Sequence, residues 1–121
     1  MAKTDSLENT IRVVDEFTKE RDWEQFHSVK NLIASVSIEA SELNETIQWS
    51  NPTVEEILGN AQLLGEIGDE IADVMVYCLR LCSELGLEPI SLMESKIEKN
   101  RMKYPVDLVK GNSSKYTAYE K

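Results

Sequence analysis

The sequence predicts an all-α fold that resembles a four-helix bundle. Apolar residues recur with a period near 3.6 along several long segments, as expected for amphipathic helices. The chain has only three prolines and five glycines, so long regular segments are possible. No segment keeps the alternation of apolar and polar residues that is typical of a strand. A length of 121 residues fits one domain, which we place at residues 1–105, followed by a polar C-terminal tail at 106–121.

The first two helices are predicted from apolar stripes, and Ser6 can cap the start of the first. The first runs from about Ser6 to Arg21, and its stripe consists of Leu7, Ile11, Val14 and Phe17. The second runs from about Ser28 to Gln48, and its stripe consists of Leu32, Ile33, Val36, Leu43 and Ile47. Serine is a favoured N-cap residue because its side chain accepts a hydrogen bond from the first turn.

An aromatic segment at residues 22–28 interrupts the helical pattern. It contains Trp23, Phe26 and His27, the only histidine of the chain. Connecting segments usually lie at the surface of a protein. The two aromatic rings therefore either pack against the end of the bundle or form a platform for a flat ligand.

Turn and cap signals divide the rest of the chain into three more helices. Pro52 disfavours helix at the residue before it, and Thr53 is a suitable N-cap for the next helix. Gly86 is a usual C-terminal signal, and Pro89 suits the first turn of a helix. The predicted helices are Val54 to Leu58, about Ala61 to Leu85, and Pro89 to the Tyr104–Pro105 pair.

Charge and composition limit the classes of function. The net charge of -9 argues against general binding of nucleic acid, which depends on lysine and arginine, but it allows a nucleotide whose phosphates are bridged by a metal. No apolar run approaches the ~18 residues of a membrane span, and residues 1–6 do not resemble a signal peptide. We expect a cytoplasmic protein. Cys78 and Cys82 are expected to be buried, reduced residues of the core.

An acidic stretch lies between Lys30 and Arg80, where the chain has no lysine or arginine. Its acidic residues are Glu39, Glu42, Glu45, Glu55, Glu56, Glu66, Asp69, Glu70 and Asp73. Glu39 falls within the apolar stripe of the second helix, where an unpaired charge costs several kcal/mol. A divalent cation is the simplest source of compensation for so many carboxylates.

The spacing of the carboxylates predicts where that cation binds. Glu39 and Glu42 form an E-x-x-E pair, and Glu70 and Asp73 form an E-x-x-D pair on a later helix. Side chains three apart on a helix share a face, and magnesium prefers oxygen ligands. Glu66 is an adjacent candidate, whereas we expect Glu45, Glu55, Glu56 and Asp69 to lie at the surface. The alternative is that all these residues form solvated helix faces.

Two further observations refine this interpretation. A di-iron bundle needs Glu-x-x-His pairs, and the only histidine is not in one, so that class is excluded. Cations return near the end of the chain, where Lys96, Lys99, Arg101 and Lys103 surround Asn100. Such a helix face either holds phosphate oxygens or is simply solvated.

These motifs resemble those of a known family. Residues 39–43 and 70–74 resemble the E-x-x-E…E-x-x-D signature of the MazG-like nucleoside triphosphate pyrophosphohydrolases, which are all-α. Residues 21–27 (RDWEQFH), 47–49 (IQW) and 96–105 (KIEKNRMKYP) are similar to the dCTP pyrophosphatase branch of that family. The resemblance covers roughly Leu7 to Pro105. Ala40 and Ser41 replace the frequent Gly and Val, and Ile38 stands where many relatives have another acidic residue.

The resemblance implies a reaction and a set of roles. It implies Mg²⁺-dependent hydrolysis of a dNTP, dCTP or a related one, to dNMP and pyrophosphate, in control of the nucleotide pool. The implied metal ligands are Glu39, Glu42, Glu70 and Asp73, with Glu42 or Glu70 as the base. The implied substrate-binding residues are Trp23, His27 and Trp49 for the base and sugar, and Lys99, Asn100, Lys103 and Tyr104 for the phosphates. It also implies a homo-oligomer, a dimer or a dimer of dimers, and we expect a tetramer.

Two alternatives stay open at this point. One is a non-catalytic helical interaction module, in which the acidic cluster serves solubility or a basic partner. The other is a related reaction on the same fold, directed at dUTP or at phosphoribosyl-ATP. Hydrolysis that requires a divalent cation distinguishes the first alternative from an enzyme, and the preferred nucleotide distinguishes the second.

Overall fold

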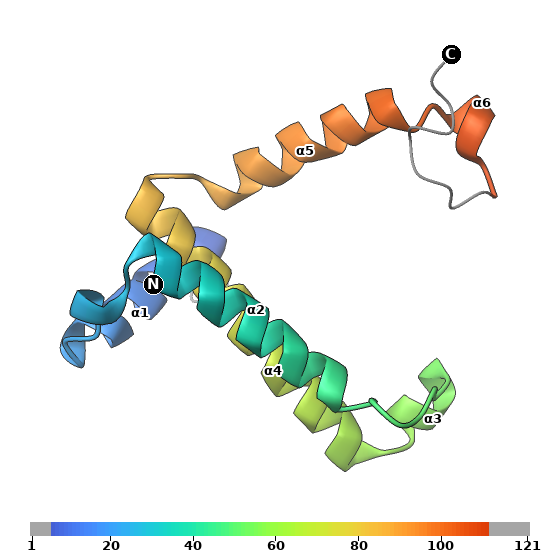
Figure 1. Cartoon of the computed structure of the whole chain (residues 1–121), viewed down its shortest axis with the longest axis horizontal. Coiled ribbons are helices and arrows are strands. Elements are labelled where there is room, and N and C mark those ends of the chain that lie inside the picture. Colours follow the sequence, from blue (N-terminus) through green and yellow to red (C-terminus); the bar gives the residue numbers. More distant parts are fainter. Residues whose placement is uncertain (1–5, 112–121) are drawn as a thin grey trace. The chain divides into compact units, whose positions relative to one another are not determined.

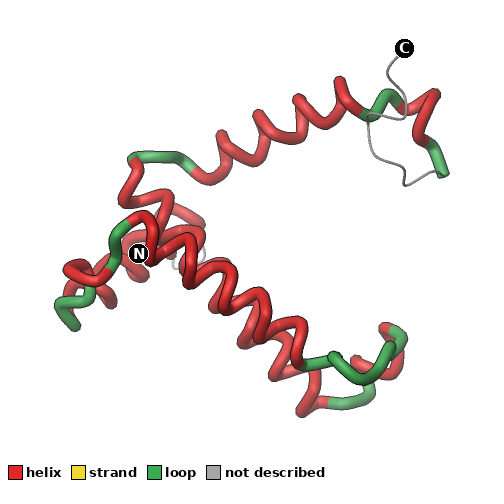
Figure 2. Tube along the Cα trace, in the orientation of Figure 1, coloured by secondary structure: helices red, strands yellow, loops and turns green. Residues whose placement is uncertain are grey.

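The computed structural model describes residues 6–111, and within this range every regular element is helical (Figure 2). This confirms the all-α prediction for the described part of the chain. The elements are α1 (Leu7–Glu20), η1 (Glu24–Phe26), α2 (Val29–Glu45), α3 (Val54–Leu58), α4 (Ala61–Leu85), α5 (Pro89–Lys103) and α6 (Val106–Val109). None of the described helices is both long enough and apolar enough to cross a membrane.

The helix ends follow from local side-chain chemistry. The hydroxyl oxygens of Ser6 and Ser28 each accept a hydrogen bond of 3.1 Å from the third backbone N–H of the following helix. Thr53 and Glu56 form a reciprocal capping box at the start of α3. Gly86 ends α4 in the left-handed region, with φ of 66°. These ends agree with the prediction from sequence.

Two predicted boundaries need correction. Helix α2 ends at Glu45 instead of Gln48, because the next three N–H groups bond to carbonyls three residues back, at 3.2 to 3.3 Å, in the tighter geometry of a turn. Residues 106–109, expected in the polar tail, form the short helix α6. The remainder of the predicted tail, residues 112–121, lies outside the described residues.

The chain divides into two compact units, one ending at Gly86 and the other beginning at Leu87. In the first unit, α2 and α4 run antiparallel and side by side, and α1 packs on α4 (Figure 1). The short helix α3 connects α2 to α4. This pairing places the acidic part of α2 beside the acidic part of α4.

The single chain buries very little apolar surface. Among the described residues, Leu32 is the only large apolar side chain that is buried, with 1% of its surface exposed. Cys78 is exposed and Cys82 is half-buried, so the prediction that both cysteines are buried in a core was wrong. The physical reason is that no other helix of the unit ending at Gly86 covers one face of α4. Leu64, Ile71, Met75 and Leu85 of the same helix are exposed as well.

Candidate active site

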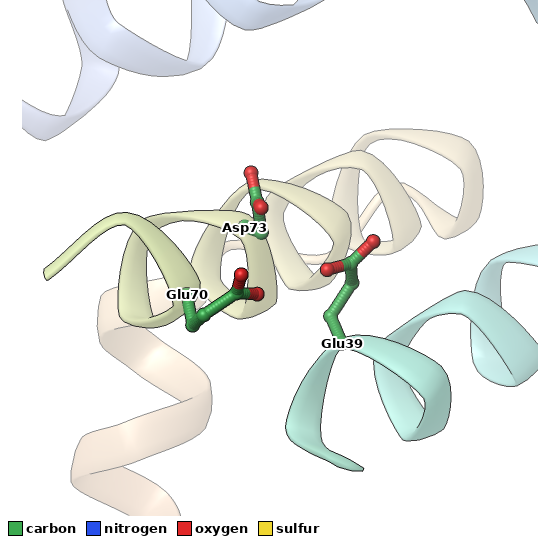
Figure 3. A group of neighbouring side chains, drawn as sticks. All are labelled: Glu39, Glu70 and Asp73. Atoms are coloured by element: carbon green, nitrogen blue, oxygen red, sulfur yellow. The ribbon is translucent and has the colours of Figure 1, made fainter. Parts of the chain in front are cut away.

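Three carboxylates meet between α2 and α4. Glu39 comes from α2, and Glu70 and Asp73 come from adjacent turns of α4 (Figure 3). One carboxylate oxygen from each residue lies within 4.8 Å of those of the other two. Residues three apart on a helix share a face, and the pairing of α2 with α4 brings Glu39 opposite that face.

Two oxygens of this cluster are buried without a partner. The Oε2 atoms of Glu39 and Glu70 are inaccessible to solvent and accept no hydrogen bond from any described group. Ionised carboxylates are acceptors only, so these neighbours cannot satisfy one another while all are charged. A buried carboxylate oxygen without a partner is costly. Either a proton or a cation must therefore compensate the cluster.

The crowding of these carboxylates raises the pKa values of two of them. A hydrogen bond shared with Glu42 raises the pKa of Glu39 to about 7, helped by burial and by the charges of Glu42, Asp73 and Glu70. Burial raises the pKa of Glu70, and the charges of Glu42 and Asp73 add to this effect. Glu42 is exposed, but it interacts with both glutamates, so it borders the cluster. Glu66 lies outside it and accepts a hydrogen bond of 3.3 Å from Gln62.

The donor set fits a hard divalent cation. The ligand atoms on offer are carboxylate oxygens, which are the protein ligands that Mg²⁺ prefers. A cation at this point would pair with the buried oxygens of Glu39 and Glu70, which lack any other partner. The chemistry of the site and its unsatisfied atoms therefore agree on the same kind of ligand.

A second polar cluster lies further along α4, and the sequence did not predict it. Arg80, with only 2% of its surface exposed, donates hydrogen bonds to His27, Asp15 and Glu84. Ser83 donates a further hydrogen bond of 2.9 Å to Asp15. The only sign in the sequence was a lone arginine within the apolar run of α4. Its partners His27 and Asp15 are 53 and 65 residues away, so no local pattern connects them.

The predicted aromatic residues have different surroundings. The ring of Trp23 meets that of Phe17 edge to face, with 5.7 Å between centroids, so it packs on α1. The imidazole of His27 lies 6.3 Å from the ring of Tyr77, one turn beyond Asp73 on α4. Trp49 lies beyond the end of α2 and is 91% exposed. Of the three residues predicted to bind the base and sugar, only His27 is shown in contact with α4.

The residues predicted on the phosphate side belong to the other unit. Lys99, Asn100 and Lys103 lie on α5, and Tyr104 is its C-terminal cap, with its N–H donating to the Asn100 carbonyl at 2.8 Å. All four belong to the unit that begins at Leu87, whereas the carboxylate cluster belongs to the unit that ends at Gly86.

The chain is similar in sequence to one family model and to several curated proteins. The model of the MazG-like family matches residues 34–118, a range that contains both acidic pairs. The chain is 34% identical to dCTP pyrophosphatase 1 of Mus musculus over 113 residues, which are 93% of this chain and 66% of that protein. It is 34% identical to dCTP pyrophosphatase 1 of Homo sapiens over 114 residues. The chain thus spans 66% of the length of these curated relatives.

A solved structure has the same fold. The crystal structure of a pyrophosphatase from Archaeoglobus fulgidus DSM 4304 superposes on this chain with a TM-score of 0.75 and 38% sequence identity. The match covers 87% of this chain and 97% of the archaeal one.

Proposed function

Since this chain belongs to the MazG-like family, we propose that it is a Mg²⁺-dependent pyrophosphohydrolase that converts a dNTP to dNMP and pyrophosphate. The curated relatives are named dCTP pyrophosphatase 1, and the archaeal relative is called a pyrophosphatase. We propose dCTP or a related dNTP as the substrate. The observation that carries the proposal is the cluster of Glu39, Glu70 and Asp73, which contains buried carboxylate oxygens with no partner.

In this proposal the metal is held by Glu39, Glu70 and Asp73, with Glu42 at the edge of the cluster. When bound, the cation supplies positive charge against phosphate oxygens and lowers the pKa of a bound water. The same charge removes the repulsion that raises the pKa of Glu39 and Glu70. The three carboxylates would then be ionised and could hold the cation.

The reaction needs one of these carboxylates as a base. Hydrolysis to the monophosphate forms a bond from water oxygen to the α-phosphorus and breaks the bond from that phosphorus to the oxygen bridging to the β-phosphorus. Pyrophosphate leaves, and the attacking water gives up a proton. We assign that proton to Glu42, at the edge of the cluster, or to Glu70, within it, because neither has a basic partner among the described residues.

The rest of the nucleotide is assigned to the residues named from the family motifs. Trp23, His27 and Trp49 would bind the base and sugar, since flat aromatic faces stack bases and an imidazole can hydrogen-bond them. The residues proposed for the phosphates are Lys99, Asn100, Lys103 and Tyr104. Lysine and amide groups suit phosphate oxygens that the cation does not reach.

We also propose that the protein is a homo-oligomer, with a tetramer as the expected form. Support comes from α4, where Leu64, Ile71, Cys78 and Leu85 recur every seven residues and are all exposed. Together with Ala61, Gly68, Met75 and Cys82 they alternate in steps of three and four, which is the spacing of a coiled-coil seam. A second copy of this chain would bury the apolar face that one chain leaves open.

The test of the activity is a panel of canonical and modified dNTPs, assayed for pyrophosphate release with Mg²⁺ and with a chelator. We expect hydrolysis that chelation abolishes and that Mg²⁺ restores. Asp73→Asn should lower kcat/KM by on the order of 10²-fold or more, because it removes a charged oxygen ligand from the cluster. Glu45→Gln, on α2 and outside the cluster, is the control. Activity that ignores chelation would refute the metal-dependent mechanism.

A further inference from the structure

Arg80 is a buried cation, and each of its three guanidinium nitrogens donates a hydrogen bond to a different side chain. Its Nε–H donates to His27 Nδ1 at 3.1 Å, Nη1 donates to Asp15 Oδ1 at 2.7 Å, and Nη2 donates to Glu84 Oε2 at 2.8 Å. The two carboxylates compensate a charge that is otherwise out of reach of water. Ser83 further fixes Asp15 through the hydrogen bond to its other oxygen.

This arrangement determines the protonation of His27. A guanidinium has donors and no acceptor, so Nδ1 of His27 must be the acceptor in its bond with Arg80. A neutral imidazole that accepts at Nδ1 carries its hydrogen on Nε2. Within residues 6–111 no group accepts a hydrogen bond from that Nε2.

The position of His27 relates it to the carboxylate cluster. Asp73, Tyr77, Arg80 and Glu84 succeed one another on α4 at steps of four, three and four, which keeps them on one face. Seven residues separate Asp73 from Arg80, or about 10 Å along the helix axis. The imidazole that Arg80 holds also lies against Tyr77, in between. A nucleotide with its phosphates at the cluster can therefore extend its nucleoside part along this face.

We propose that Arg80 is a positioning residue, which holds His27 as a neutral imidazole with its Nε2–H directed to an acceptor oxygen of the nucleoside part of the substrate. The inference rests on the proposed function and adds to it. It predicts that the site selects ligands with an acceptor at this point. Arg80 itself does not contact the nucleotide in this proposal.

The charges around His27 favour the neutral form. Burial and then the positive charge of Arg80 lower the pKa of His27, while Glu84 and Glu24 act in the opposite direction. The remaining titratable neighbours are Tyr77, in ring contact, and Asp15, which acts through Arg80. Protonation at Nδ1 would place two donors against each other and break the bond to Arg80.

Nuclear magnetic resonance of the full chain tests the tautomer directly, because His27 is the only histidine. Long-range proton–nitrogen spectra of the ¹⁵N-labelled protein distinguish a protonated Nε2 from a protonated Nδ1. We expect the Nε2–H form near neutral pH, and a pKa below the ordinary value of 6.5. An Nδ1–H form in the unsubstituted protein would overturn the proposal.

Arg80→Met tests whether the arginine is the cause. We expect a mixture of tautomers and a higher pKa of His27, because the donor and the positive charge are gone while Glu84 remains. Arg12→Met is the matched control, since Arg12 is exposed and its side chain bonds, among residues 6–111, only to Asn9. If Arg80→Met does not fold, the triple variant that adds Asp15→Asn and Glu84→Gln also removes the two negative charges that would otherwise lack a cation. A single retained tautomer in the folded variant would refute the role of Arg80.

The link to substrate is tested with dCMP and with turnover. Titration of dCMP should shift the Nε2–H resonance to saturation, and Arg80→Met should raise KM for dCTP roughly fivefold with kcat little changed, as for one lost hydrogen bond. An unmoved resonance, or a loss confined to kcat, would contradict the inference. If the unsubstituted protein hydrolyses no dNTP, the proposed function fails, whereas the tautomer spectrum still decides what Arg80 does.

Discussion

At the scale of single residues, the protein places a negative charge that no other described residue neutralises. Glu39 lies on the face of α2 that meets α4, and within residues 6–111 its buried Oε2 has no hydrogen-bond partner. Arg80 is also buried, but its charge is compensated, because two carboxylates and an imidazole accept hydrogen bonds from it. We interpret the compensated charge of Arg80 as a means of positioning His27, and the uncompensated charge of Glu39 as a sign of a bound cation.

The uncompensated glutamate predicts a particular dependence of stability on pH. Folding raises the pKa of Glu39 from 4.5 to about 7, so the folded state binds the proton more tightly than the unfolded state. The free energy of unfolding should therefore fall as the pH rises from 4.5 to about 7 in the absence of metal. His27, whose pKa is lowered, contributes in the opposite sense below its ordinary value of 6.5. Added Mg²⁺ should restore stability above pH 7.

Glu39→Gln separates these contributions. The substitution removes the repulsion, so we expect about 1 kcal/mol more stability at pH 8 without metal, loss of the Mg²⁺ effect, and loss of dNTP hydrolysis. Urea titrations at pH 5 and pH 8, with and without Mg²⁺, measure the stability and the Mg²⁺ effect, and pyrophosphate release measures the hydrolysis. Glu45→Gln, also on α2 but outside the cluster, should change none of these properties. A variant that is unfolded at both pH values would show that Glu39 is a structural partner.

At the scale of elements, the helices begin and end where short-range chemistry requires. Gly86 is the clearest case, because it has φ of 66° and no atom within 4 Å of where a side chain would begin. Strain of the backbone, and not crowding, is therefore the only reason for glycine at this position. Gly65, within α4, also has open space around it and has no such backbone constraint.

This difference predicts opposite effects of the same substitution. Gly86→Ala should destabilise the protein by about 1 kcal/mol, since a left-handed conformation disfavours any side chain. Gly65→Ala should stabilise it by up to ~1 kcal/mol, because alanine is the better residue inside a helix. Urea unfolding midpoints at one fixed protein concentration measure both. If both variants change the stability in the same direction, the backbone conformation of the glycine does not explain the effect.

Local signals explain which elements were predictable. Ser6, Thr53 and Gly86 act within a few residues of themselves, so the sequence predicted the helix ends they define. The end of α2 was predicted three residues too late, because the apolar stripe continues through Ile47 while the backbone already turns. Helix α6 is too short to have a period, so its four residues were assigned to the tail.

The same reasoning applies to the candidate site. Glu39, Glu70 and Asp73 were predicted from spacing within two helices, and the pairing of those helices brings them together. The hydrogen bonds of Arg80 with Asp15 and His27 depend on how three separate elements pack, so no pattern within one segment reveals them. The environment of Trp49 was not predictable either, since exposure depends on what covers the end of α2.

At the scale of the whole molecule, the described part of a single chain buries little apolar surface. Leu32 alone is fully buried among the large apolar residues described. A domain of this size normally buries roughly two-thirds of the surface that its unfolded chain exposes. The seam of α4, Ala61 to Leu85 at steps of three and four, is mostly exposed and is a regular apolar feature available for association.

A charge in this seam should therefore separate the subunits. Ile71 is 44% exposed at the middle of the seam, and Ile71→Glu would bury a carboxylate between two chains without a partner. We expect light scattering to show a smaller species at micromolar concentration, with a lower melting temperature. Gln62→Glu adds the same carboxylate to α4 outside the seam and should leave the mass unchanged. An unsubstituted protein that is already monomeric would contradict the proposed association.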